Sequence, residues 1–217
     1  MSRPMMKYIQ RLTCCLATLF AIGMVSFVSA DPVVVFNPAT GLNGTNINQS
    51  VGWQFNVNTA LTVTALGWYD EGADGLAVGH TLGIWNPAGT LLATVFVPAG
   101  TVGFLDGQFR SIAIAPIVLP VGVGYIVGGE NFATNTERLA FNVTQTVDSR
   151  INYFDATFNA VVSGFTRPTN FSVATTGFYG PGFSILPPVA EVPEPATMLL
   201  LGTGLAGIAI KARKKRR

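Results

Sequence analysis

The chain has 217 residues, of which 49% are hydrophobic and only 11% are charged, so it suits one domain of ordinary size with added targeting segments. The formal net charge of +2 comes from the two ends. Residues 31–190 hold four arginines, no lysine and nine acids, which gives this body a net charge of −5. An acidic body repels phosphate backbones and argues against nucleic acid as a partner.

Residues 1–30 show the three parts of a secretory signal peptide. Three cations open the segment: Arg3, Lys7 and Arg11. An apolar run follows over residues 14–27, and small residues end the segment. We predict a signal helix that is cleaved between Ala30 and Asp31. The alternative is an uncleaved membrane anchor, for which roughly 14 apolar residues are short, because a bilayer span needs about 20.

Residues 31–180 are predicted to form an all-β domain. Apolar and polar residues alternate over residues 51–57 and 61–65, and this period of two indicates strands. Further strands are predicted at residues 91–97, 109–115, 125–127, 139–144, 151–154 and 171–175. Asn86-Pro87-Ala88-Gly89 has the length of a hairpin loop before the strand at residue 91. No crossover helix is visible, so we expect an antiparallel β-sandwich that is jelly-roll-like.

The last part of the chain changes in composition. Prolines crowd into residues 181–191, which predicts an extended linker. Residues 192–217 are predicted to be a tail with a transmembrane helix over the uncharged residues 196–210 and a basic end. Fifteen residues span about 22 Å as a helix, short of a hydrocarbon core of about 30 Å. This shortness favours a transient membrane segment over a permanent one.

The tail resembles the PEP-CTERM sorting signal of exported bacterial proteins. The resemblance rests on Val192, Pro193, Glu194 and Pro195, the apolar residues after them and the basic terminus. It implies recognition by an exosortase, transient anchoring in the inner membrane, loss of the tail, and final placement at the cell surface or in extracellular polymer. The alternative is a C-terminal anchor that is never processed. The Gly202-x-Gly204-x-x-Gly207 spacing is not a dinucleotide fingerprint, because no strand precedes it.

Residues 50–130 resemble a β-sandwich domain of unknown function that recurs in exported bacterial proteins. The resemblance rests on Trp53-Gln54-Phe55, on the run from Val63 to Asp70 and on the run from His80 to Trp85. It implies a fold and no activity.

Few residues of the body suggest chemistry. Asp70, Glu71 and Asp74 are candidate calcium ligands, although aspartate and glycine also favour turns for conformational reasons. The single histidine, His80, is expected to be structural, since catalysis or zinc binding would need partners for it. Both cysteines lie in the signal peptide, so neither a disulfide nor a thiolate metal site is expected. No cofactor is expected, and calcium is the only candidate.

These observations predict a non-enzymatic surface or matrix protein that contacts extracellular polysaccharide. The tryptophans and the tyrosines could form a sugar-stacking platform, but aromatic residues on strands more often belong to a core. The tryptophans are Trp53, Trp68 and Trp85. Two alternatives stay open: a secreted carbohydrate hydrolase that uses the carboxylates of the body, and a purely structural protein without a small ligand.

Overall fold

The computed structural model describes residues 30–40, 42–43, 47–159, 164–172 and 178–187. Within these ranges the secondary structure is almost all strand, with one 3-10 helix at Pro38–Thr40, and the named strands pair antiparallel. None of the helical structure in these ranges is long and apolar enough to cross a membrane. The predicted signal helix and the predicted transmembrane helix lie outside the described residues.

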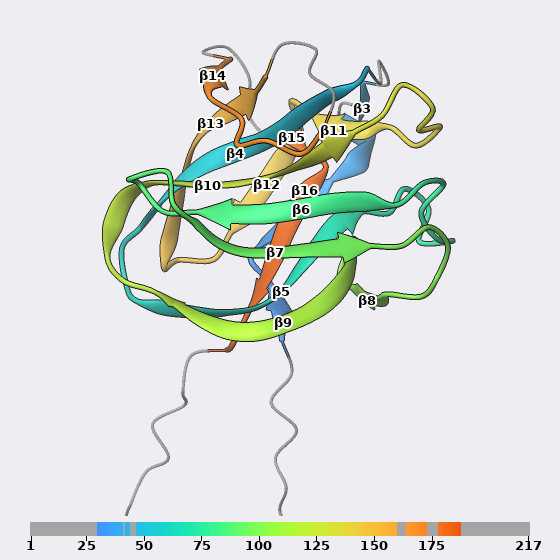
Figure 1. Cartoon of the computed structure of the whole chain (residues 1–217). Coiled ribbons are helices and arrows are strands. Elements are labelled where there is room, and N and C mark those ends of the chain that lie inside the picture. The colour runs from blue at the N-terminus through green and yellow to red at the C-terminus, as the bar shows by residue number, and fades with distance from the viewer. Residues whose placement is uncertain (1–29, 41, 44–46, 160–163, 173–177, 188–217) are drawn as a thin grey trace, which may run out of the picture. The chain divides into compact units, whose positions relative to one another are not determined.

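Two large sheets form the domain (Figure 1). The five-stranded sheet has the order β1 (Asp31–Pro32), β16 (Pro181–Ile185), β5 (Leu61–Tyr69), β9 (Phe109–Leu119), β8 (Phe104–Asp106). The six-stranded sheet has the order β14 (Asn170–Phe171), β13 (Ile151–Phe158), β4 (Gln49–Val57), β10 (Gly122–Asn131), β6 (His80–Trp85), β7 (Leu91–Val97). Consecutive strands often lie in different sheets, as in a sandwich whose chain crosses between layers.

Two small sheets complete the fold. One contains β15 (Phe178–Tyr179), β11 (Leu139–Phe141) and β3 (Leu42–Asn43), and the other contains β12 (Thr144–Val147) and β2 (Val34–Asn37). The segment predicted as one strand over residues 139–144 is therefore divided. Asn142 has a φ of 54° between β11 and β12, which is a conformation that ends a strand.

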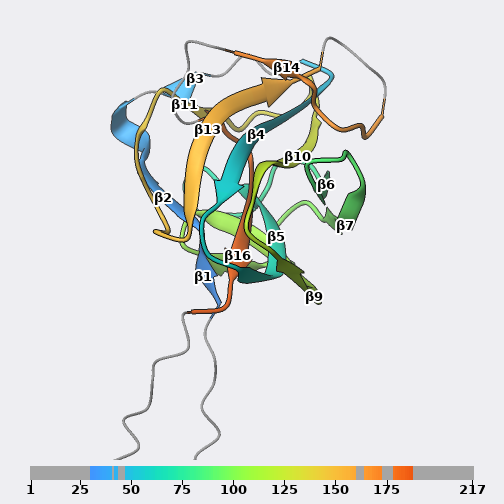
Figure 2. The ribbon, with the colours of Figure 1, turned by 90° about the vertical axis from the view of Figure 1, so that its left-hand side faces the viewer.

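The core forms between the two large sheets, as the alternating pattern predicts. Trp53 and Phe55 of β4 point inward and are fully buried. Phe183 of β16, in the other sheet, packs against Trp53 with ring centroids 5.6 Å apart, and the Trp53 indole donates a hydrogen bond to the carbonyl of Pro181 over 2.9 Å. Figure 2 shows β4 and β13 in one layer and β16 and β5 in the other. The predicted all-β antiparallel sandwich is confirmed.

The hairpin predicted around residues 86–89 is confirmed. β6 and β7 pair antiparallel, and the Asn86 amide donates to the carbonyl of Thr90 over 3.0 Å. Gly89 has a φ of 86°, which a residue without a Cβ adopts at no steric cost.

The predicted boundary of the linker at residue 181 is wrong. Pro181–Ile185 forms the fully buried strand β16, which pairs with both β1 and β5. Pro181 is tolerated because it is the first residue of the strand. Gly182 leaves room for the Phe109 ring, which would lie 2.6 Å from a Cβ at that position. The core cluster spans residues 33 to 185, and residues 1–187 group apart from residues 188–217, so residues 31–187 contain their own core.

Candidate functional site

Two polar regions of the domain could carry function. The first is a cluster of carboxylates in the loops beside β5, which we call the carboxylate cluster: Asp70, Asp74 and Glu137. The second is an open groove on the outer face of the six-stranded sheet. The two regions differ in how their charged groups are satisfied.

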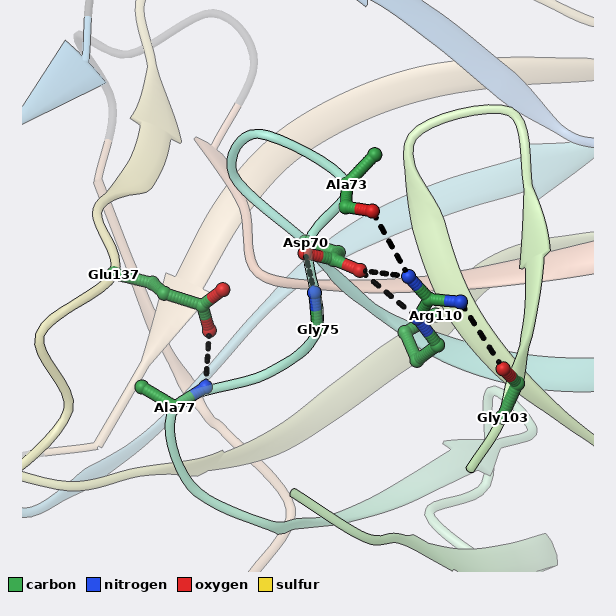
Figure 3. Close-up of polar contacts among 7 residues, drawn as sticks. All are labelled: Asp70, Ala73, Gly75, Ala77, Gly103, Arg110 and Glu137. Atoms are coloured by element: carbon green, nitrogen blue, oxygen red, sulfur yellow. Dashed lines mark hydrogen bonds and ion pairs between the residues drawn. The ribbon is translucent and has the colours of Figure 1, made fainter. Parts of the chain in front are cut away.

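Asp70 joins the loop after β5 to strand β9 through Arg110 (Figure 3). The carboxylate accepts two hydrogen bonds from the Arg110 guanidinium, at 2.9 and 2.6 Å, and both side chains are buried. The other carboxylate oxygen accepts from the Gly75 amide over 3.1 Å. The guanidinium also donates to the carbonyls of Gly103 and Ala73. Both carboxylate oxygens of Asp70 thus have hydrogen-bond partners within the domain, so this ion pair serves to hold the loop against β9.

Glu137 reaches the same place from the loop between β10 and β11. Its carboxylate accepts a hydrogen bond from the Ala77 amide over 3.1 Å. One carboxylate oxygen from each of Asp70, Asp74 and Glu137 lies within 4.8 Å of the others. Burial, together with the nearby carboxylates, raises the pKa of Glu137 to about 7, while the hydrogen bond from Ala77 opposes the shift. Glu137 therefore titrates near neutral pH.

Glu71, the third calcium candidate from the sequence, does not join the cluster. Its carboxylate accepts hydrogen bonds from Arg138, one of them at 2.8 Å from Nε. This bonding lowers the pKa of Glu71. The third carboxylate of the cluster is therefore Glu137 and not Glu71. Sequence reasoning missed Glu137 because it is distant in the chain from Asp70 and Asp74 and has no local pattern. Three carboxylates could hold a calcium ion, but Arg110 already supplies a positive charge to Asp70.

His80 has the structural setting that the sequence suggested. Its side chain is fully buried, and its ring stacks on Trp68 with centroids 3.8 Å apart and planes at 6°. Nδ1 lies 2.7 Å from the carbonyl oxygen of Glu130, which assigns the proton to this nitrogen. Burial lowers the pKa of His80 to about 4, so the ring is neutral at neutral pH.

The tryptophans do not form a sugar-binding platform. Trp53, Trp68 and Trp85 are at most 4% exposed and belong to the interior. Phe154 of β13, which lines the groove, is an exposed aromatic ring of the six-stranded sheet, with 63% of its surface accessible. Sequence reasoning did not single it out.

A row of glycines shapes the outer face of the six-stranded sheet. Gly83, Gly128 and Gly52 lie side by side on β6, β10 and β4. A Cβ on Gly128 would lie 2.8 Å from Pro168, and one on Gly83 would lie 2.6 Å from Phe165. Residues 164–169 therefore pack directly on this glycine row, and we call them the strap. The rings of Phe165 and Trp85 are 5.3 Å apart.

The groove lies beside the strap and has a volume of about 500 Å³. Its lining combines amides, apolar groups and one cation: Gln54, Asn56, Pro87, Val123, Phe154 and Arg167. Gln54 and Asn56 alternate with the buried Trp53 and Phe55 on β4, so they lie on the outer face. This alternation was the only sequence signal for the groove, since the other lining residues come from separate loops and strands.

The sorting residues Val192, Pro193, Glu194 and Pro195 lie outside the described residues, but comparison with known families covers them. Residues 191–217 match the PEP-CTERM protein-sorting motif. The chain carries a PEP-CTERM sorting signal. This signal supports export, sorting by an exosortase and association of the C-terminus with the membrane. No curated protein and no solved structure matches the PEP-CTERM chain, so the resemblance of its body to a domain of unknown function stays a prediction.

Proposed function

We propose that this PEP-CTERM chain is a non-catalytic surface or matrix protein whose β-sandwich binds extracellular polysaccharide through the groove. The sorting signal supports the destination. The observation that supports the ligand is the lining of the groove, where side-chain amides lie beside an exposed phenyl ring. Extracellular polymer is the ligand that such a protein meets after export.

The chemistry of the groove suits a sugar. Amide side chains such as Gln54 and Asn56 both donate and accept hydrogen bonds, as do sugar hydroxyls. Asn56 is positioned because its side-chain oxygen accepts the Gly124 amide over 3.0 Å, which leaves its NH₂ group to donate. An exposed ring such as Phe154 offers an apolar face to the C–H groups of a pyranose. A volume of about 500 Å³ lies in the usual range for small-ligand sites.

The proposal of a binding protein rather than a hydrolase rests on the state of the carboxylates. A glycosidase needs two carboxyl groups that flank one bond of the substrate. Asp70 is held by Arg110 and Glu71 is held by Arg138, so neither carboxylate is free to act on a substrate. We expect no release of reducing ends from any polysaccharide that the domain binds.

Substitution of one glutamate in the tail tests the sorting proposal. In a host with an exosortase, Glu194→Ala should stay in the membrane fraction with Arg217 still present by mass spectrometry. Glu191→Ala is the matched control, because it removes the same charge just outside the Val-Pro-Glu-Pro sequence, and it should be processed. Normal processing of Glu194→Ala, or a wild-type chain that keeps Arg217, would contradict the proposal.

A sedimentation assay tests the polysaccharide proposal. Residues 31–187 should co-sediment with insoluble extracellular polysaccharide from a bacterium that carries an exosortase. Phe154→Ala should weaken this binding, while Phe171→Ala, which removes another exposed ring on the edge strand β14, should not. Equal losses for both variants would place the binding surface elsewhere, and no binding of the wild-type domain would refute the proposal.

A further inference from the structure

The four arginines of the body differ in their partners. Arg110 pairs with Asp70, Arg138 pairs with Glu71, and Arg150 pairs with Asp148. Arg167, which lines the groove, makes no ion pair within the part of the chain that the structure describes. Its Nε is buried and has no hydrogen-bond partner among the same residues. The groove thus contains a guanidinium that the fold itself does not neutralise.

The backbone of Arg167 is fixed from both sides. The Asn159 side chain donates to the carbonyl of Arg167 over 2.8 Å and accepts the Thr169 amide over 2.9 Å. On the other side, the Thr166 amide donates to the Ser50 hydroxyl over 3.2 Å. Pro168, the next residue of the strap, packs against Gly128. The backbone that carries the guanidinium is thus held in place, which lowers the ordering cost for a ligand that binds it.

The groups around the Arg167 guanidinium are polar, but among the described residues no carboxylate makes an ion pair with it. Nη1 of Arg167 would lie 3.6 Å from a Cβ on Gly89, so the hairpin between β6 and β7 forms one wall. Asp155 of β13 is opposite Gln54 in the register, but its carboxylate accepts the Ala156 amide and makes no ion pair with Arg167. The amides and the phenyl ring of the groove complete the site.

We propose that the groove recognises a carboxylated sugar, such as a uronic acid unit, with Arg167 binding the carboxylate and Gln54, Asn56 and Phe154 binding the ring. A guanidinium presents two parallel donors that match the two oxygens of a carboxylate. The rest of the body carries excess negative charge, so selectivity for the acidic sugar comes from this local contact. The inference rests on the proposed polysaccharide-binding function and specifies its ligand class.

Calorimetric titration of residues 31–187 with two probes tests this assignment. The probes are a galacturonate hexamer and a neutral galactose hexamer. The wild-type domain should bind the acidic probe roughly tenfold or more tightly than the neutral one, as expected for a charge-assisted pair. Arg167→Gln should lose most of this preference and keep its affinity for the neutral probe. Arg138→Gln, which removes an exposed cation elsewhere, should behave as wild type.

Each other outcome has a defined meaning. Equal binding of both probes, or a preference that survives Arg167→Gln, overturns the carboxylate assignment and leaves the polysaccharide proposal standing. Failure of both probes to bind overturns the carboxylate assignment, and the sedimentation assay then decides the polysaccharide proposal separately. Arg167→Lys guards against a folding defect, because it keeps the charge and should retain part of the preference, and the melting temperature of each variant is measured alongside.

Discussion

The carboxylate cluster and the groove are both polar, yet they use arginine in opposite ways. In the cluster, the Arg110 guanidinium is buried and makes two hydrogen bonds to one carboxylate. In the groove, the Arg167 guanidinium faces amides and a phenyl ring and makes no ion pair among the described residues. A charge that the fold satisfies contributes to structure, whereas a charge that the fold positions but leaves open is available to a ligand.

Removing the cation of the cluster should give the largest loss of stability. Arg110→Gln leaves Asp70 buried without its ion-pair partner, and breaking such a pair typically costs about 3–5 kcal/mol. Urea unfolding should therefore show a clear fall in the free energy of unfolding, whereas Arg167→Gln should show little change. If the two variants were equally stable, the contrast between the regions would fail.

The pH dependence of the free energy of unfolding should show the titration of Glu137. Its pKa in the folded state is raised to about 7 from an unfolded value of 4.5, so its contribution is fully present below pH 4.5 and is lost as the pH rises through 7. A shift of this size corresponds to about 3.4 kcal/mol, and because solvent screening reduces such a value, we expect a loss of about 2–3 kcal/mol. Glu137→Gln should remove this loss with rising pH when unfolding is measured by urea at several pH values.

His80 gives a contribution of the opposite sign over an overlapping pH range, and the Glu137→Gln variant separates the two. Its pKa falls from 6.5 to about 4 in the folded state, so its contribution is present above pH 6.5 and is lost as the pH falls through 4. The two contributions therefore offset each other between about pH 4.5 and 6.5, so the wild-type curve should be nearly flat there, whereas stability should rise with pH over this range in Glu137→Gln. A Glu137→Gln curve that still declined between pH 5 and pH 8 would contradict the assignment to Glu137.

A substitution in the glycine row should reduce stability less than Arg110→Gln does, and it should affect ligand binding more. In Gly128→Ala the new Cβ would lie 2.8 Å from Pro168, so the strap must shift. We expect a loss of about 1–2 kcal/mol, as for other overpacked sites, together with weaker binding of the galacturonate hexamer. Unchanged binding in a destabilised variant would show that the position of the strap does not govern Arg167.

Calcium should give the smallest effect. Because Arg110 already neutralises Asp70, we expect millimolar calcium, or removal of divalent ions by EDTA, to shift the melting temperature by no more than about 1 °C. Differential scanning calorimetry at pH 8, where Glu137 is mostly charged, is the most demanding condition. A shift of several degrees would assign a cation to Asp70, Asp74 and Glu137.

The sequence predicted the fold where the signal was local. Alternation over residues 51–57 predicted β4, and the Asn86–Gly89 loop predicted the hairpin of β6 and β7. It failed for β16, because prolines and glycines suggested a linker, whereas the first-position Pro181 and the close packing at Gly182 suit a buried strand. Only the pairing with β1 and β5, distant in the chain, distinguishes the two cases.

The sites were harder to predict than the strands, because they depend on contacts between distant segments. Asp70 and Asp74 were recognised from a local cluster of acids, but Glu137 enters from another loop and Glu71 turns to Arg138. Arg167 had no feature in the sequence that set it apart from the other three arginines. Its difference appears only when the ion pairs of the fold are known.

The most direct test of the account is a nuclear magnetic resonance titration of residues 31–187 with the galacturonate hexamer. The side-chain NH₂ signals of Gln54 and Asn56 and the Nε signal of Arg167 should shift together and saturate at one concentration, while the amides of Gly75 and Ala77 in the cluster should not move. Shifts centred on Gly75 and Ala77, or no shift in the groove, would contradict the claim that the open guanidinium marks the ligand site.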